Sequence, residues 1–155
     1  MLNLLRNLFP SKKDRDVKML QPYVEQVHAT YEGYSSMTDD ELRGKSDELR
    51  SRIKEYTQEL QTELADLKEE AENTSDVLKK NELNEQIDKL TKDLYSQLDE
   101  IMEELVPEAF SVVKETARRL TENGGLTVQA SEWDEEIANK HEYVTIENGQ
   151  ATWAN

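Results

Sequence analysis

Apolar residues recur at helical spacing in two stretches of similar length. In the first stretch the apolar positions are separated by three or four residues: Leu49, Ile53, Tyr56, Leu60, Leu64, Leu67 and Ala71. The second stretch repeats the same steps: Leu83, Ile87, Leu90, Leu94, Leu98, Ile101 and Leu105. Such spacing places one apolar stripe on each helix and leaves the other faces to charged and amide side chains. The pattern predicts two amphipathic helices.

The two stripes match position by position when the second helix folds back on the first. Leu49 then faces Leu105 and Ala71 faces Leu83, and the residue numbers of every facing pair add up to 154. The centre of this mirror follows residues 73–76, a cluster of turn and cap residues. The sequence therefore predicts a helical hairpin over residues 49–105, with arms about 35 Å long at 1.5 Å per residue. Consecutive steps of four argue against strong left-handed supercoiling.

Helical spacing continues on both sides of the hairpin. Apolar residues from Val17 to Tyr34 indicate a helix from Asp14 onward, and Pro22 inside it is expected to kink or restart the helix. Thr38 and Glu41 have the spacing of a capping box at the start of the next helix. After the hairpin, Pro107 is expected to begin a new helix that extends to residue 120, with residues 123–125 as its C-cap and loop. Its expected apolar stripe consists of Phe110, Val113, Ala117 and Leu120.

The last 34 residues have a different pattern. Residues 126–128 form a candidate strand, and Ser131 is a candidate cap for a short helix. The Asn148-Gly149 pair between two β-rich runs predicts a β-hairpin over residues 142–154 with a type I′ turn. The expected fold is therefore mainly α, with a long antiparallel helical hairpin, flanking helices and a small C-terminal β-hairpin. The chain divides into residues 1–12, 13–121 and 122–155.

The first nine residues have a two-faced pattern of their own. If they are helical, six apolar side chains share one arc: Met1, Leu2, Leu4, Leu5, Leu8 and Phe9. Pro10 ends the segment, and a basic cluster follows it. Two interpretations are open. The helix lies on a membrane or partner surface, or it docks its apolar face on its own protein.

Charge and composition exclude several functions. The net charge is −15, whereas residues 1–20 alone carry +3. An acidic surface argues against nucleic-acid binding. The sequence has no cysteine, so a disulfide framework and thiolate metal sites are excluded, and a reducing cytoplasm is expected. No apolar run approaches the roughly 20 residues that cross a bilayer. His28 and His141 are too far apart in sequence to suggest a metal site, and no nucleophile–base pair is visible, so we expect no catalytic residue and no metal ligand.

Three stretches together resemble SecA, the ATPase motor of bacterial preprotein export. Residues 36–46 are similar to an early helix signature of that family, residues 105–119 to the next helix, and residues 1–16 to its N-terminus. The signature residues, to which we assign a structural role, are Thr38, Asp39, Asp40, Glu41, Leu42, Pro107, Glu108, Ala109, Phe110, Arg118 and Arg119. The hairpin and residues 122–155 then correspond to insertions that some members of the family carry.

The resemblance implies the N-terminal part of an ATP-driven export motor. Its partners would be the Sec translocon channel, the anionic membrane surface and preproteins. It would be cytoplasmic and peripheral on the inner membrane. The resemblance also allows a homodimer. Residues expected to contact membrane or translocon are Leu2, Leu4, Leu5, Arg6, Leu8, Phe9, Lys12 and Lys13.

Helices 38–46 and 107–120 would brace the first nucleotide-binding domain of such a motor. ATP and Mg²⁺ belong to the presumed parent, because the five glycines of this chain form no phosphate loop, and we expect the chain alone to be inactive as an ATPase. The alternative is a stand-alone acidic coiled-coil interaction module with a membrane-tethering helix.

Overall fold

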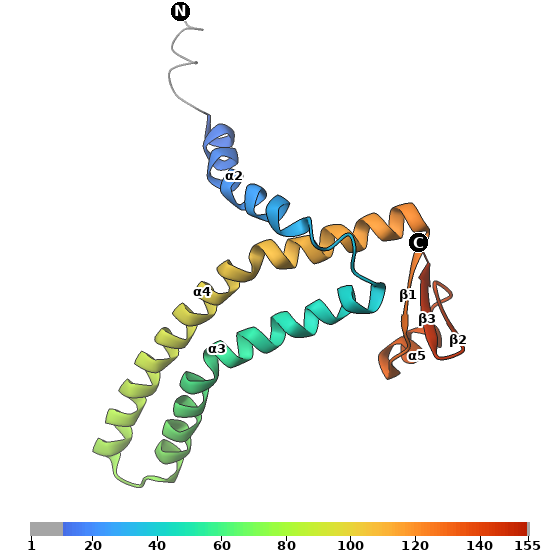
Figure 1. Cartoon of the computed structure of the whole chain (residues 1–155). Helices are drawn as coiled ribbons and strands as arrows, with labels where there is room; N and C mark the ends of the chain where they lie inside the picture. Colours follow the sequence, from blue (N-terminus) through green and yellow to red (C-terminus); the bar gives the residue numbers. More distant parts are fainter. Residues whose placement is uncertain (1–10, 155) are drawn as a thin grey trace, which may run out of the picture. The chain divides into compact units, whose positions relative to one another are not determined.

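The structure is a computed structural model, and it describes residues 11–154. The apolar arc predicted for residues 1–9 therefore lies outside the described residues. The described residues form four helices and one sheet (Figure 1): α2 Lys12–Tyr31, α3 Asp39–Asn73, α4 Val77–Asn123, β1 Gly125–Gln129, α5 Glu132–Ala138, β2 Val144–Glu147 and β3 Gln150–Ala154. The mainly α class with a C-terminal β element is confirmed.

These elements fall into two compact units. The first, which we call the hairpin unit, comprises residues 45–105, and the second, which we call the joint unit, comprises the described residues 11–44 and 106–154. Since α3 and α4 each cross the boundary, both helices contribute to both units.

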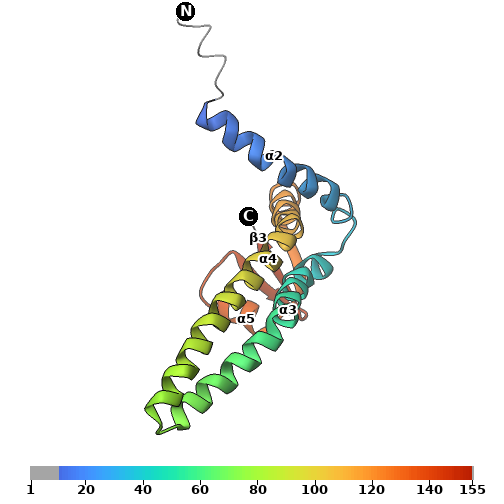
Figure 2. The ribbon, with the colours of Figure 1, turned by 90° about the vertical axis from the view of Figure 1, so that its left-hand side faces the viewer.

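In the hairpin unit, α3 and α4 run side by side in both views (Figures 1 and 2), as the mirrored stripes predict. The apolar stripes meet between the arms, where several side chains are buried: Leu64, Ala71, Leu83, Ile101 and Leu105. Arg52 Nη2 lies 3.1 Å from Glu104 Oε1 across the arms. This ion pair is two residues from the predicted register, which long side chains can span.

The stripe differs from the prediction at one position. Tyr56 is 42% exposed, whereas Thr57 is completely buried. The threonine hydroxyl donates to the carbonyl oxygen of Ile53 at 2.9 Å, so its burial leaves no unpaired donor. The placement of Tyr56 in the stripe was therefore wrong, because the periodicity counted threonine as polar. With Thr57 in the stripe, the steps from Ile53 to Ala71 alternate between four and three, and the argument against supercoiling no longer holds for this arm.

In the joint unit, helix α4 continues through Pro107, so the prediction that a new helix begins there is wrong. Phe110 and Val113 are 60% and 64% exposed, whereas Pro107, Ser111, Glu115 and Arg119 lie on the buried face. Ser111 Oγ donates to the carbonyl oxygens of Pro107 at 2.7 Å and of Val27 in α2 at 3.3 Å. Packing against α2 thus supports the helix at the point where proline removes a backbone donor.

Helix α2 likewise runs through Pro22 and does not restart. It begins with a capping box in which the Ser11 side chain accepts from the backbone N–H of Asp14. None of its residues is buried, and the side chains of Val17, Leu20 and Val24 are 45–55% exposed. The expected apolar stripe is present on α2, but within residues 11–154 little covers it.

The C-terminal residues form a three-stranded antiparallel sheet in the order β1-β3-β2, so the predicted hairpin gains the 126–128 strand as a third member. Asn148 and Gly149 have φ values of 50° and 77°, as a type I′ turn requires. Val128, Val144 and Ala151 are buried. Helix α5, capped by Ser131 as predicted, packs on β2. The Trp133 and Trp153 rings stack with centroids 5.0 Å apart.

We predict that Gln97→Leu stabilises the hairpin unit. Gln97 Oε1 is buried and has no hydrogen-bond partner among the described residues, and the predicted register places Gln97 opposite Thr57. An unpaired buried acceptor costs about 1–3 kcal/mol, so the variant should unfold at higher urea concentration, with a gain of about 1 kcal/mol followed by circular dichroism. Gln86→Leu, on an exposed position of the same helix, should change stability by less than about 0.5 kcal/mol. A loss of stability in Gln97→Leu would contradict the assignment.

Candidate functional site

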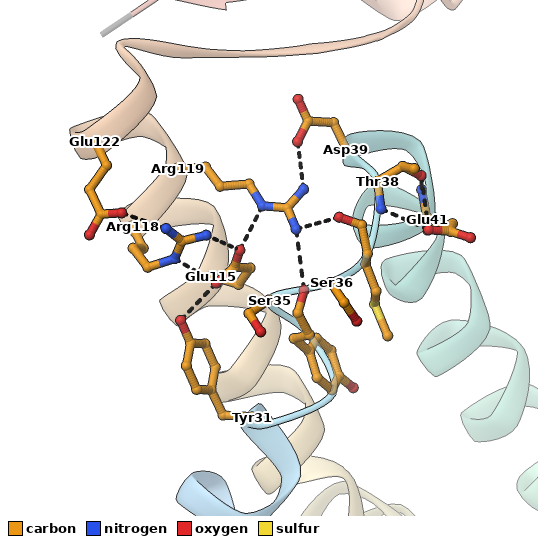
Figure 3. A network of polar contacts seen from close by, with 12 residues as sticks. Tyr31, Ser35, Ser36, Thr38, Asp39, Glu41, Glu115, Arg118, Arg119 and Glu122 are labelled. Atoms are coloured by element: carbon orange, nitrogen blue, oxygen red, sulfur yellow. Dashed lines mark hydrogen bonds and ion pairs between the residues drawn. The ribbon is translucent and has the colours of Figure 1, made fainter.

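Arg119, near the C-terminal end of α4, is the centre of a buried polar network (Figure 3). It is 4% exposed. Its Nε donates to Glu115 Oε1 at 2.7 Å, and its Nη1 pairs with Asp39 Oδ1 at 2.5 Å. Asp39 is the first residue of α3, so this ion pair joins the end of α4 to the start of α3.

The remaining guanidinium nitrogen of Arg119 holds the connection between α2 and α3. Nη2 donates to the carbonyl oxygens of Tyr34 at 3.2 Å and of Met37 at 2.7 Å. A guanidinium presents its donors in a fixed planar fork, which suits several acceptors at once. Arg119 therefore fixes the position of a segment that contains no helix or strand.

Glu115 lies one helical turn before Arg119 and is completely buried. Arg118 contacts both its oxygens, with Nε 2.9 Å from Oε2 and Nη2 2.7 Å from Oε1, and the Tyr31 hydroxyl donates to Oε2 at 2.7 Å. Hydrogen bonds from Arg118 lower the pKa of Glu115, whereas burial raises it. Further hydrogen bonds from Arg119 and Tyr31 also lower this pKa, and the result is a pKa of about 2. The carboxylate is therefore charged near neutral pH and serves as an acceptor, not as a proton donor.

The first turns of α3 also cover the outer edge of β1. Thr127 N donates to Asp39 Oδ2 at 2.9 Å, and Gln129 N donates to Asp40 Oδ1 at 2.7 Å. In an antiparallel sheet alternate residues of an edge strand turn their N–H groups outward. Two outward N–H groups of β1 are thus paired with carboxylates of α3.

Arg43, one turn further along α3, completes this edge contact. Its Nη1 lies 2.7 Å from Asp134 Oδ2, and its Nη2 donates to Ser131 Oγ at 3.0 Å. Burial favours the neutral form of Asp134, but hydrogen bonds from Arg43, Ser131 and Trp153 outweigh it and lower its pKa to about 2. We call the Arg119 network and this β1 edge contact together the joint.

The structure brings together part of the predicted signature. Thr38 and Glu41 form the expected capping box, with Thr38 N donating to Glu41 Oε2 at 2.7 Å and Glu41 N donating to Thr38 Oγ1 at 3.2 Å. The joint also contains four signature residues: Asp39, Asp40, Arg118 and Arg119. Leu42, near the start of α3, is buried.

The remaining predicted residues lie elsewhere. Pro107 is buried one turn before Ser111, Glu108 and Ala109 are half-buried, and Phe110 is exposed. Lys12 and Lys13 are exposed in the first turn of α2. Six predicted membrane contacts lie outside the described residues: Leu2, Leu4, Leu5, Arg6, Leu8 and Phe9.

Four important members of the joint were not predicted: Tyr31, Arg43, Glu115 and Asp134. For Glu115 the available signal was the spacing of Pro107, Ser111, Glu115 and Arg119 at intervals of four residues, because it defines one face of a helix. That face was overlooked since the apolar stripe on the neighbouring face was assumed to be the buried one.

The chemistry of the joint is that of a structural connection. Its charged groups are paired with each other and with backbone groups, which fixes α2, α3, α4 and β1 in one arrangement. Over residues 11–154, no group of three or more His, Asp or Glu side chains has an arrangement suited to a metal ion. Over the same residues, no helix has the length and hydropathy needed to span a membrane.

The chain is similar in sequence to SecA proteins of several bacteria. The chain is 40% identical to the protein translocase subunit SecA of Amoebophilus asiaticus over 157 residues, which cover all of this chain and 14% of that protein. It is 34% identical to the SecA of Christiangramia forsetii over 99% of this chain, and 34% identical to that of Porphyromonas gingivalis W83 over 97%, in each case 14% of the relative. No family model and no solved structure matches.

The relatives are subunits of protein translocases. The chain is homologous over its whole length to one region of SecA. The chain spans about 14% of the length of the curated relatives it matches.

We predict that Glu115→Gln strongly destabilises the joint unit. The change removes the buried negative charge that faces Arg118 and Arg119, and loss of one partner of a buried ion pair costs about 3–5 kcal/mol. The pKa of Glu115 is about 2 in the folded chain against 4.5 as its ordinary value, so its contribution is complete above pH 4.5 and is lost as the pH falls toward 2. Urea unfolding of the native chain should therefore show a loss of stability over this range that is smaller in the variant.

The matched control is Glu122→Gln, which removes a 58% exposed partner of Arg118. It should cost less than about 1 kcal/mol and leave the acid profile unchanged. Equal effects of the two variants would show that Glu115 is not the centre of the pairing.

Proposed function

We propose that the chain is the N-terminal segment of a SecA-type, ATP-driven preprotein export motor, which contacts membrane and translocon and braces the first nucleotide-binding domain. The observation that carries this proposal is homology along the whole chain to protein translocase subunits. ATP and Mg²⁺ would bind in a part of the parent outside residues 1–155. Preproteins and the Sec translocon channel would be partners of that parent, on the cytoplasmic side of the inner membrane.

The bracing role is supported by the joint. Asp39, Glu115 and Arg119 fix three helices and a strand in one arrangement. On α4, the side chains of Phe110 and Val113 point outward from this arrangement and are more than half exposed. In a larger protein, such apolar side chains on a rigid helix suit contact with the following domain.

The membrane role is supported by α2 and the residues before it. The exposed apolar side chains of Val17, Leu20 and Val24 lie on α2, which begins with the exposed Lys12 and Lys13. Apolar side chains can enter the headgroup boundary while nearby lysines interact with anionic lipid at about 1 kcal/mol each. The net charge of −15 opposes approach to such a surface, so the contact would be weak and peripheral.

We predict that the chain can replace the homologous region of the Amoebophilus asiaticus SecA. The chimera, reconstituted with that organism's translocon and membrane vesicles, should retain preprotein translocation and preprotein-stimulated ATP hydrolysis within about tenfold. The same chimera with Arg119→Ala should lose most translocation, since the start of α3 and the α2–α3 connection would no longer be fixed to α4. Glu122→Gln in the chimera is the control and should match the parent chimera.

A stably folded chimera without activity would overturn the export assignment and favour a stand-alone acidic coiled-coil module. Full activity of Arg119→Ala would overturn the bracing role and leave the homology to SecA intact.

We also predict weak, salt-sensitive binding of the intact chain to anionic vesicles. Flotation with phosphatidylglycerol vesicles should recover more of the intact chain than of a chain lacking residues 1–13, and sodium chloride should reduce the difference because salt screens exposed charges. Neutral phosphatidylcholine vesicles serve as the control lipid. Equal flotation of the two chains, or no preference for anionic lipid, would favour a helix docked on its own protein.

A further inference from the structure

The two edges of the C-terminal sheet differ. The sheet order is β1-β3-β2, so β1 and β2 are the edge strands. The outward N–H groups of β1 at Thr127 and Gln129 are occupied by carboxylates of α3. An edge strand whose outward N–H and C=O groups are unoccupied is a ready template for another strand. Whether the outward groups of β2 are occupied therefore decides whether a further strand can add there.

The register shows which groups of β2 turn outward. Ala154 N donates to the carbonyl oxygen of Tyr143 at 2.8 Å, so residues 143 and 154 form a hydrogen-bonded pair between the strands. Hydrogen-bonded residue pairs alternate along the two strands with pairs that are not hydrogen-bonded to each other. The backbone N–H and C=O groups of Val144 and Ile146 therefore point away from β3, toward the outer edge of the sheet. Val144 N reaches the carbonyl oxygen of His141 at 3.5 Å, whereas the backbone N–H of Ile146 has no recorded partner within the described part of the chain.

An open groove of about 540 Å³ runs along this edge between α5 and β2. On the helix side the groove is lined near the C-terminal end of α5, where Ala138 is the last helical residue. The full lining is Glu135, Ala138, Asn139, Val144, Thr145, Ile146 and Glu147. An edge strand beside a helix, with a groove between them, has the geometry in which an extended peptide adds to a sheet.

The charge of the groove indicates the kind of peptide. Glu135 and Glu147 line it, and no Lys or Arg does. Lys140, the nearest basic residue in sequence, is paired with Glu136 at 2.5 Å. An added strand of about the length of β2 would place alternate side chains toward the groove, where lysine or arginine would complement the two carboxylates.

We propose that the β2 edge is a docking site for an extended basic segment of another polypeptide, which binds as a fourth strand in the groove between α5 and β2. Backbone hydrogen bonds to Ile146 would supply the strand pairing. Glu135 and Glu147 would select basic over acidic sequences. None of the residues that line the groove belongs to the joint or to the proposed membrane contact.

The test is titration of the 155-residue chain with a blocked peptide of alternating lysine and valine. Trp133 and Trp153 are the only tryptophans of the chain, and Trp153 pairs with Val144 of β2, so tryptophan fluorescence reports on this region. The peptide should change the emission saturably, and NMR-detected hydrogen exchange at the Ile146 amide should slow at least tenfold. The same peptide with glutamate for lysine should bind at least tenfold more weakly.

Two pairs of variants separate strand addition from a loose electrostatic contact. Ile146→Pro removes the outward N–H without removing a bond between β2 and β3, and Ile146→Ala shortens the side chain but keeps the N–H. The proline variant should bind at least tenfold more weakly than the alanine variant. Glu135→Gln with Glu147→Gln should weaken binding about threefold to tenfold, whereas Glu82→Gln with Glu85→Gln, an equal charge change in the hairpin unit, should not.

Circular dichroism from the stacked tryptophans checks that each variant keeps its sheet. Absence of peptide binding at millimolar concentration would overturn the proposal. So would equal affinity of folded Ile146→Pro and Ile146→Ala, or unchanged exchange of the Ile146 amide in the saturated complex.

Discussion

The arrangement of helices and sheet in the joint unit depends on the Asp39 carboxylate, which binds two elements at once. Asp39 uses Oδ1 for the guanidinium of Arg119 and Oδ2 for the backbone N–H of Thr127. One side chain at the start of α3 therefore contacts the end of α4 and the edge of β1 at the same time. A buried guanidinium is costly unless its charge is paired and its donors are engaged, and Arg119 makes four hydrogen bonds, to Glu115, Asp39 and two carbonyl oxygens. The position of each element is thereby tied to that of the others.

This arrangement gives a physical meaning to the residues that resemble the SecA signature. Asp39 and Asp40 favour the positive end of the α3 dipole, and in addition they act as acceptors for the N–H groups of β1. Arg118 and Arg119 are adjacent in sequence and share Glu115 as a partner. Arg118 also reaches Glu122, whereas Arg119 also reaches the α2–α3 connection. The signature is thus a set of complementary charges from two distant parts of the chain.

The hairpin and the β-turn could be predicted because each follows from a local rule. Helical spacing defines the stripes of α3 and α4, and Asn148-Gly149 has the backbone freedom that its turn needs. The joint could not be predicted in the same way. The contacts that join its elements are between residues 80 or more positions apart, and the periodicity of Phe110 and Val113 favoured the wrong face of α4. The error at Thr57 has the same origin, because a hydroxyl that bonds within its own helix behaves as a core residue.

The carboxylates on the β1 edge also limit how copies of this chain could associate through their sheets. Continuous fibres require two different edges, so that the β1 edge of one molecule can pair with the β2 edge of the next. Asp39 and Asp40 occupy outward N–H groups of β1, which leaves β2 as the accessible edge of the sheet. Pairing of β2 with the β2 of a second molecule has twofold symmetry and ends at two copies. The side chains that hold the joint together therefore also prevent open-ended polymerisation through the sheet.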